Sequence, residues 1–301
     1  GHETLVATVV GEVLERDPDT IRVVHADSLN ALPSNSPVGS RMAIMLGGAA
    51  AGAARKIKAT LLAIAAHTLK KAPAQLEYRE GSVSVKGDAQ QSLSWAQLVE
   101  IAHRKIHLMP PGLEPGLQAK FVWEVPGGGG LPTADGRVQM YPCYAFEAHV
   151  VYVEIDPDTA QPVLRRYVCG HDCGVMINPD IVHGMTYGGI AHGIGAALYE
   201  KFAYSDNGQL ESQSFMDYLI PTALEVPEMS IVDHCTPSPH TTFGQKGSGE
   251  AGYLGAPAAI ACAINDALAP LGASIAELPM TPLAIWTRMQ AARAGSKGPA
   301  A

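Results

Sequence analysis

One glycine-rich stretch governs the interpretation of this chain: Gly244-Gln245-Lys246-Gly247-Ser248-Gly249-Glu250-Ala251-Gly252. Glycine loses more conformational freedom on folding than other residues, so such density predicts positive φ angles or close backbone packing. Pro257 and the residues from 258 to 268 predict a helix that begins shortly afterwards. Glu250 on this loop is a candidate general base. From these nine residues alone, an exposed turn glutamate is the favoured interpretation.

The same stretch satisfies the dinucleotide-binding spacing Gly247-x-Gly249-x-x-Gly252. That motif needs a strand before it and a helix after it. Residues 236–242 carry two prolines and are incompatible with a central parallel strand. The acidic residue expected about 20 positions later is also missing, because Asp266 comes too early and Glu277 too late. The spacing therefore does not indicate a dinucleotide fold.

Composition limits the classes of protein. With 301 residues, the chain is long enough for one large domain or two modest ones. Hydrophobic residues make up 47% and charged residues 17%, which suggests that some surface is buried against partner chains. A net charge of -8 argues against nucleic acid or an anionic membrane as partner. The apolar segment 46–69 carries Arg55, Lys56 and Lys58, so we expect a core helix and no membrane span.

The chain has five cysteines and no Cys-x-x-Cys pair. Cys169 and Cys173 flank His171 and Asp172, which suggests a metal site, but zinc would need two more ligands at suitable spacing. We expect buried, reduced thiols in an intracellular protein. No metal-ligating side chains are predicted.

Periodicity predicts a mixed α+β (mixed α/β) architecture without repeats. Helices are expected over 1–15, 46–69, 94–104 and 182–200, a strand over 20–25, and hairpins over 76–85 and 145–169. The Pro- and Gly-rich segment 107–137 is predicted to be a long surface or interface loop. It would separate two lobes, about 1–105 and 140–289, within a domain spanning 1–289, followed by a flexible tail over 290–301.

Three segments expose backbone groups. The helix near 184–200 contains Gly184, Gly188, Gly189, Gly193 and Gly195. Each interior glycine costs about 0.5–1 kcal/mol relative to alanine, so these residues need either close helix packing or a ligand lying on the backbone. The Gly39-Ser40-Arg41 turn and the Glu250 loop are the other two. Free N–H groups of this kind suit phosphate oxygens.

Four ordered motifs carry a family resemblance: Gly174–Pro179, Tyr187–Glu200, Asp217–Thr222 and Lys246–Glu250. This series resembles the molybdenum hydroxylases, the superfamily of xanthine dehydrogenase, aldehyde oxidase and carbon monoxide dehydrogenase large subunits. It covers the chain to about Met289. Gly1-His2-Glu3-Thr4 resembles the end of a Gly-Gln-Gly-His-Glu-Thr loop whose glutamine would precede this chain. The resemblance thus implies the second molybdopterin-binding domain, as a piece or subunit of something longer.

The resemblance also implies residue roles. Glu250 would be the base that accepts a proton while an electron-poor carbon is hydroxylated, which suits a carboxylate whose pKa is raised by desolvation. The cofactor would be molybdopterin, as the cytosine dinucleotide, with molybdenum held by the pterin dithiolene, so that no side chain ligates the metal. The residues expected to hold this cofactor are Gly39, Ser40, Arg41, Lys246, Gly247, Ser248, Gly249, Gly1, His2, Gly188 and Gly189.

By the same resemblance, the chain would work with another molybdopterin-domain chain and with 2Fe-2S and FAD subunits or domains. The small-molecule substrate would be an aldehyde, an N-heterocycle or a related compound. We expect a cytoplasmic protein, or a periplasmic one if a partner carries an export signal. Met185 and His192 stand where family members commonly have glutamine, and methionine cannot donate the same hydrogen bonds. A non-catalytic assembly subunit on the same fold is the alternative.

Overall fold

The computed structural model describes residues 1–25, 27–29, 38–124, 126, 132–139 and 141–295. The chain forms two compact units. The first contains Gly1–Cys143 and Ser238–Lys246, and the second contains Tyr144–Pro237 and Gly247–Ala301. The expected lobes, about 1–105 and 140–289, leave out one feature of this division: the chain returns to the first unit at Ser238–Lys246.

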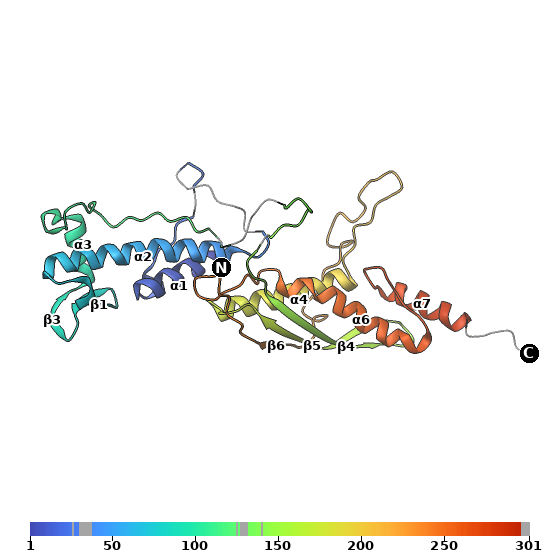
Figure 1. Cartoon of the computed structure of the whole chain (residues 1–301). Coiled ribbons are helices and arrows are strands. Elements are labelled where there is room, and N and C mark those ends of the chain that lie inside the picture. Colours follow the sequence, from blue (N-terminus) through green and yellow to red (C-terminus); the bar gives the residue numbers. More distant parts are fainter. Residues whose placement is uncertain (26, 30–37, 125, 127–131, 140, 296–301) are drawn as a thin grey trace, which may run out of the picture. The chain divides into compact units, whose positions relative to one another are not determined.

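The 28-residue helix α2 (Met42–Leu69) runs through the first unit, and α1 (His2–Leu14) packs along it (Figure 1). Small residues on α2 admit two aromatic rings. A Cβ on Gly48 would lie 2.5–2.8 Å from the ring of Trp123, and Gly52 lies just as tightly against Phe121. These glycines are therefore explained by the segment that runs along the helix. Both expected helices, over 1–15 and 46–69, are confirmed, with α2 starting four residues earlier than expected.

A small antiparallel sheet, β1 (Leu76–Arg79), β2 (Ser82–Val85) and β3 (Asp88–Leu93), adjoins the C-terminal half of α2. Helix α3 (Trp95–His103) follows, and Ser94 and Gln97 form a capping box at its start. The core of this unit gathers around Leu61, Ile64, Val83, Leu98 and Ile101. The hairpin and α3 are confirmed, whereas β3 was not predicted.

The strand expected over 20–25 is wrong. A 3-10 turn, Pro18–Thr20, precedes residues that have no strand pairing, and Val24 is 76% exposed. β-branched residues favour a strand only where a neighbouring strand and a packed face are available. This segment has neither.

The second unit is built on a sheet of β4 (Phe146–Ile155), β5 (Pro162–Asp172) and β6 (Met229–Asp233), in the order β4-β5-β6. β4 and β5 form the expected hairpin, and β6 pairs in parallel with β5. Helices α4 (Pro179–Leu198) and α6 (Ala256–Leu268) cover one face of this sheet (Figure 1). Both helices are confirmed. Their core contacts include Tyr167, Ile190, Ile194, Ile260 and Ile264.

The apolar stretch Ala251–Leu271 is long and hydrophobic enough, by length and composition, to cross a membrane. One face of it packs into the core, and 22% of its most apolar window is buried. Ile260, Ile264 and Leu268 are at most 1% exposed in the core that α6 forms with the sheet and α4. Gly255 also separates it into α5 (Ala251–Leu254) and α6, so the stretch contains two helices. We interpret it as core structure.

Helix α7 (Pro282–Gly295) was not predicted, and it extends past Gln290, where the flexible tail was expected to begin. Residues 296–301 of that tail lie outside the described residues. The cysteines are all free thiols. Cys169 and Cys173 are buried as expected, but Cys235 and Cys262 are exposed, so the expectation of buried thiols is wrong for those two.

Candidate functional site

Glu250 stands at the N-terminus of the short helix α5, in a turn whose backbone is internally bonded. Ala251 N–H donates to Ser248 O at 3.2 Å, and Tyr253 N–H donates to Glu250 O at 3.1 Å. Gly252 lets this turn approach α4, because a Cβ there would lie 2.9 Å from Thr186 Cα. The loop glycine is therefore required by close backbone packing, one of the two possibilities its density indicated.

Glycines on α4 complete this contact from the other side. A Cβ on Gly189 would lie 2.8 Å from Tyr253 N, and one on Gly193 would lie 2.5 Å from Ala256 Cβ. Close helix packing thus accounts for Gly189 and Gly193. Gly184 and Gly188 differ, since a Cβ on either would meet nothing within 4 Å. The backbone of Gly188 is therefore accessible, as a ligand contact would require.

His192 adds a side-chain contact to the same packing. Its ring stacks on Tyr253 with centroids 4.4 Å apart and planes inclined by 25°. Tyr253 lies three residues after Glu250, on α5. His192 therefore helps to fix the helix that Glu250 begins.

Glu250 itself is exposed in this chain. The sequence-based expectation of a desolvated carboxylate is wrong for the chain by itself. The physical reason is local: the flanking residues of the turn are mostly glycine and serine, which have little or no side chain to cover a carboxylate.

In the first unit, the Gly39-Ser40-Arg41 turn leads directly into α2. Gly39 and Ser40 have φ values of 75° and 56°, and Arg41 is the N-cap of the 28-residue helix. A side chain at Gly39 would collide with the hydroxyl of Tyr141, so the turn is closely packed. The positive end of a long helix dipole and its free N–H groups favour an anion at this point.

Gln245 connects this turn to the segment Ser238–Lys246, and its role was not predicted. Its Nε2 donates to Ala43 O at 2.9 Å, while its Oε1 accepts from Phe243 N–H at 2.9 Å. The side chain is 1% exposed. Lys246, which is 5% exposed, is thereby held near the first turn of α2. The available signal in the sequence was a glutamine inside a glycine-rich run. A buried side-chain amide needs hydrogen-bond partners, so a glutamine there can tie the loop to another segment.

Two buried hydroxyls in the same segment have no hydrogen-bond partner among the described residues, Thr241 Oγ1 and Thr242 Oγ1. Buried polar groups are normally satisfied by protein, water or ligand. They lie in the same segment as Gln245, whose side chain contacts the first turn of α2. Hydroxyls of this kind can donate to a ligand that carries acceptor oxygens.

The predicted site residues are therefore divided between the units. Gly1 and His2 are exposed at the start of α1, in the first unit with Gly39, Ser40, Arg41 and Lys246. The second unit holds Gly188, Gly189, Gly247, Ser248, Gly249 and Glu250. In the first unit, Gln245 links the segment that ends at Lys246 to the first turn of α2. In the second unit, Gly189 and Gly252 allow α4 and α5 to pack closely.

The motif Gly174–Pro179 has a local structural role. The Asn178 side chain accepts from Ile181 N–H at 3.0 Å and caps α4, whose first residue is Pro179. Asp172, which is buried, accepts from Gly174 N–H at 2.8 Å and from Thr236 N–H at 3.1 Å. These contacts fix the start of the helix that supports α5.

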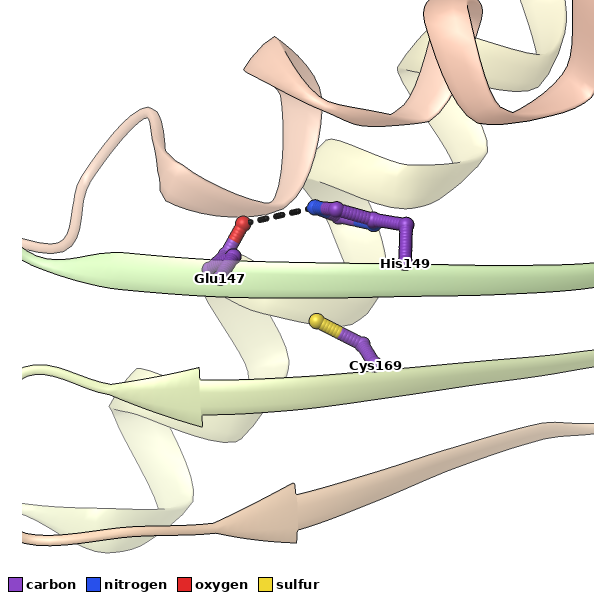
Figure 2. A group of neighbouring side chains, drawn as sticks. All are labelled: Glu147, His149 and Cys169. Carbon is purple, nitrogen blue, oxygen red and sulfur yellow. Dashed lines mark hydrogen bonds and ion pairs between the residues drawn. The ribbon is translucent and has the colours of Figure 1, made fainter. Parts of the chain in front are cut away.

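A second polar group lies on the covered face of the sheet, and sequence reasoning missed most of it. Glu147 accepts from His171 Nδ1 at 2.6 Å and pairs with His149 Nε2 at 3.0 Å, as the dashed line in Figure 2 shows for the second contact. His149 Nδ1 lies 2.8 Å from the Tyr167 hydroxyl. The thiol of Cys169 points into the same group from β5 (Figure 2). Alternation on paired strands was the available signal: Glu147-x-His149 and Tyr167-x-Cys169-x-His171.

Burial and hydrogen bonding compete in this group. Burial alone raises the pKa of Glu147, but hydrogen bonds from His149 and His171 outweigh it and hold the pKa below its usual value. Burial lowers the pKa of His171, but the neighbouring Cys173 and Glu147 outweigh it and raise the pKa to about 9. Burial, with Glu147 nearby, raises the pKa of Cys169 to about 12. The metal-free group therefore combines a carboxylate with a protonated thiol.

Comparison with known proteins identifies the family. A family model described as a molybdopterin cofactor-binding domain matches residues 1–227. The chain is 36% identical over 282 residues to the nicotine 6-hydroxylase large subunit of Paenarthrobacter nicotinovorans, covering 94% of this chain and 33% of that protein. It is 31% identical over 290 residues to the carbon monoxide dehydrogenase large chain of Hydrogenophaga pseudoflava, covering 96% and 34%.

Among solved structures, quinoline 2-oxidoreductase from Pseudomonas putida 86 superimposes with a TM-score of 0.84 at 34% identity, covering 96% of this chain and 35% of that one. The chain thus spans about a third of the length of these relatives. The mixed α+β fold expected from sequence is confirmed. By sequence and by fold, the chain belongs to the molybdopterin cofactor-binding domain family of the molybdenum hydroxylases.

Proposed function

We propose that this chain supplies the molybdopterin-binding and base-bearing part of a molybdenum hydroxylase. The observation that carries the proposal is the arrangement around Gln245. This residue links the N-terminus of α2 to the segment that ends at Lys246, and Glu250 follows four residues later in the sequence. Along the sequence, the segment that we assign to binding of an anionic cofactor is therefore followed directly by the packed turn that carries the Glu250 carboxylate.

In this proposal, molybdopterin in its cytosine dinucleotide form is held by Gly39, Ser40, Arg41 and Lys246, with the hydroxyls of Thr241 and Thr242 as further donors. When bound, the cofactor supplies the redox-active molybdenum and accepts the electrons of the oxidised carbon. Arg41 and the α2 dipole offset phosphate charge. Gly188 and Gly247–Gly249 are also assigned to cofactor binding, because residues with little or no side chain leave their backbone groups accessible.

Glu250 acts as the general base, and its carboxylate takes up a proton from the water-derived oxygen that is transferred to the substrate. Another polypeptide that covers the turn would exclude water from this carboxylate. Gly189, Gly252 and His192 position the carboxylate through the packing of α5 on α4. Other chains or domains then carry the electrons away through 2Fe-2S clusters and FAD. The names "large subunit" and "large chain" of two relatives support a multi-subunit assembly.

The substrate class we propose is an electron-poor ring carbon of an N-heterocycle. Two relatives at 36% and 34% identity are named for nicotine and quinoline, both of which contain such rings. Aldehydes are the alternative within the same chemistry. Steady-state assays with quinoline, nicotine and an aromatic aldehyde distinguish the two, and preference for the aldehyde would contradict the N-heterocycle assignment.

Replacing the base tests the central step. Glu250→Gln keeps the size of the side chain and removes its proton acceptor. General-base catalysis contributes about 10²–10⁴-fold, so we expect kcat/KM to fall by at least about 100-fold while molybdenum content is unchanged. Glu277→Gln, at another exposed glutamate of the same unit, is the matched control and should behave as the wild type.

Two results would contradict the proposal. Substantial turnover by Glu250→Gln would remove the assigned base. An assembled complex that holds its partners in full stoichiometry but contains no molybdenum would show that this chain is not part of a catalytic centre.

A further inference from the structure

The polar group beneath α5 and α6 has a geometry that the proposed hydroxylase chemistry does not use. In the register of β4 and β5, Glu147 lies opposite His171, and His149 lies opposite Cys169. One ligand atom from each of Glu147, His149 and Cys169 lies within 4.8 Å of the other two. Figure 2 shows the three side chains converging from the two neighbouring strands.

This group is enclosed. The side chains of Glu147, His149 and His171 are 7%, 5% and 0% exposed. Gly255, at the junction of α5 and α6, covers the imidazole, because a Cβ on that residue would lie 2.5 Å from His149 Nε2. A carboxylate is expensive to bury unless it is paired or coordinates a metal, whereas a neutral thiol is readily buried.

The imidazole of His171 orients the carboxylate of this group. Its Nδ1 lies 2.6 Å from Glu147 Oε1, while Glu147 Oε2 lies 3.0 Å from His149 Nε2. One carboxylate oxygen is thus fixed by His171, and the other faces the histidine that lies opposite Cys169.

We propose that Glu147, His149 and Cys169 form a zinc site in the second unit, built from residues other than those assigned to the molybdenum cofactor. The donor set is nitrogen, sulfur and oxygen, which favours Zn²⁺ over Mg²⁺ or Ca²⁺. Three protein ligands leave a fourth position for water. Binding releases the thiol proton of Cys169, and the contact between His149 and Glu147 is replaced by bonds from both side chains to the ion.

The surrounding hydrogen bonds already have the pattern that zinc ligands require. A ligating histidine is normally oriented through its other ring nitrogen, and a ligating carboxylate is itself hydrogen-bonded. Here Tyr167 holds His149 Nδ1 at 2.8 Å, and His171 holds Glu147 Oε1 at 2.6 Å. Tyr167 and His171 are therefore positioning residues. Pairing β4 to β5 through a metal would stiffen the sheet under the turn that carries Glu250.

The site is tested by metal binding to the full chain together with the polypeptides that co-purify with it. The protein is stripped with a chelator under reducing conditions, returned to Zn²⁺ or Co²⁺, and analysed for zinc, cobalt and molybdenum. We expect one equivalent of zinc per chain. The cobalt form should show tetrahedral d–d bands and a thiolate-to-cobalt charge-transfer band.

Variants assign the ligands. Cys169→Ser should abolish the charge-transfer band, whereas Cys262→Ser, at an exposed cysteine of the same unit, should leave it unchanged. Tyr167→Phe should weaken zinc affinity about 10–100-fold, the usual effect of losing a partner that orients a ligand. The cobalt spectrum of the unmodified chain needs no variant, so a folding defect in Cys169→Ser does not decide the test.

Absence of bound zinc or cobalt would overturn the proposal, and so would binding that survives Cys169→Ser undiminished. Molybdenum content is read in the same samples. Zinc without molybdenum would therefore contradict the proposed function and leave the zinc site standing, and the reverse result would do the opposite.

Discussion

Gly189 offers a sharp test of how the Glu250 turn is held. A Cβ at residue 189 would lie 2.8 Å from Tyr253 N and 3.0 Å from Gly252 C, both backbone atoms that cannot rotate away. Gly189→Ala must therefore move α5 away from α4. Gly184, one turn earlier on the same helix, has nothing within 4 Å of its missing Cβ, so Gly184→Ala is the matched control.

The two variants share one energy term and differ in another. Each gains about 0.5–1 kcal/mol from replacing a helical glycine with alanine. Only Gly189→Ala incurs the cost of inserting a methyl group into a packed contact, about 1–3 kcal/mol. The free energy of unfolding of Gly189→Ala should therefore lie about 1–3 kcal/mol below that of Gly184→Ala.

Urea unfolding followed by far-UV circular dichroism measures this difference. In the assembled enzyme, Gly189→Ala should also lower kcat, because α5 begins at Glu250, while molybdenum content stays normal. Gly184→Ala should keep full activity. Equal stability of the two variants would refute the close backbone contact. A destabilised Gly189→Ala with unchanged kcat would refute the link between this packing and the carboxylate.

Two further predictions concern the first unit. Gln245→Ala leaves Ala43 O and Phe243 N–H without their partner, so we expect a loss of about 1–3 kcal/mol and weaker cofactor retention, measured by thermal unfolding and molybdenum content. Glu15 accepts from Lys58 at 2.8 Å and from Glu80 N–H at 2.9 Å, and the hydrogen bond from Lys58 is the largest cause of its lowered pKa. This stabilisation is present above the ordinary pKa of 4.5 and is lost as the pH falls through the lower folded-state value. Glu15→Gln should thus be less stable than the wild type by under about 1 kcal/mol at pH 7, because the pair is partly exposed, and the difference should vanish in acid. A difference that persists in acid would contradict it.

Local pattern was sufficient for elements whose partners are close in sequence. The 76–85 and 145–169 hairpins and the helix capped by Ser94 were all predicted, because turn residues, alternation and caps lie within a few residues of one another. β6 was missed because its partner β5 is far away along the chain and pairs with it in parallel. Residues 20–25 show the opposite error, since their β-branched composition has no strand to pair with.

The sequence predicted the site only where a local pattern, such as glycine density, indicates the role of a residue. Glycine density correctly indicated close approach, but only the coordinates distinguish Gly189, which packs against Tyr253, from Gly188, which meets nothing. Gln245 was overlooked because its role depends on Ala43, about two hundred residues earlier in the chain. The zinc ligands were overlooked for a related reason: Glu147 and Cys169 become neighbours only once the register of β4 and β5 is fixed.

The exposure of Glu250 follows from the same glycines that hold its turn in place. Gly252 and Gly189 allow the backbone of α5 to lie directly on α4, and this contact fixes the backbone position of Glu250 at the start of α5. Residues without side chains cannot also cover it, so rigidity and desolvation must come from different sources. The domain supplies the rigidity by packing backbone on backbone. In the proposed function, the low-dielectric surroundings that favour a general base would come from another polypeptide. This chain therefore positions the carboxylate of Glu250 and leaves it exposed.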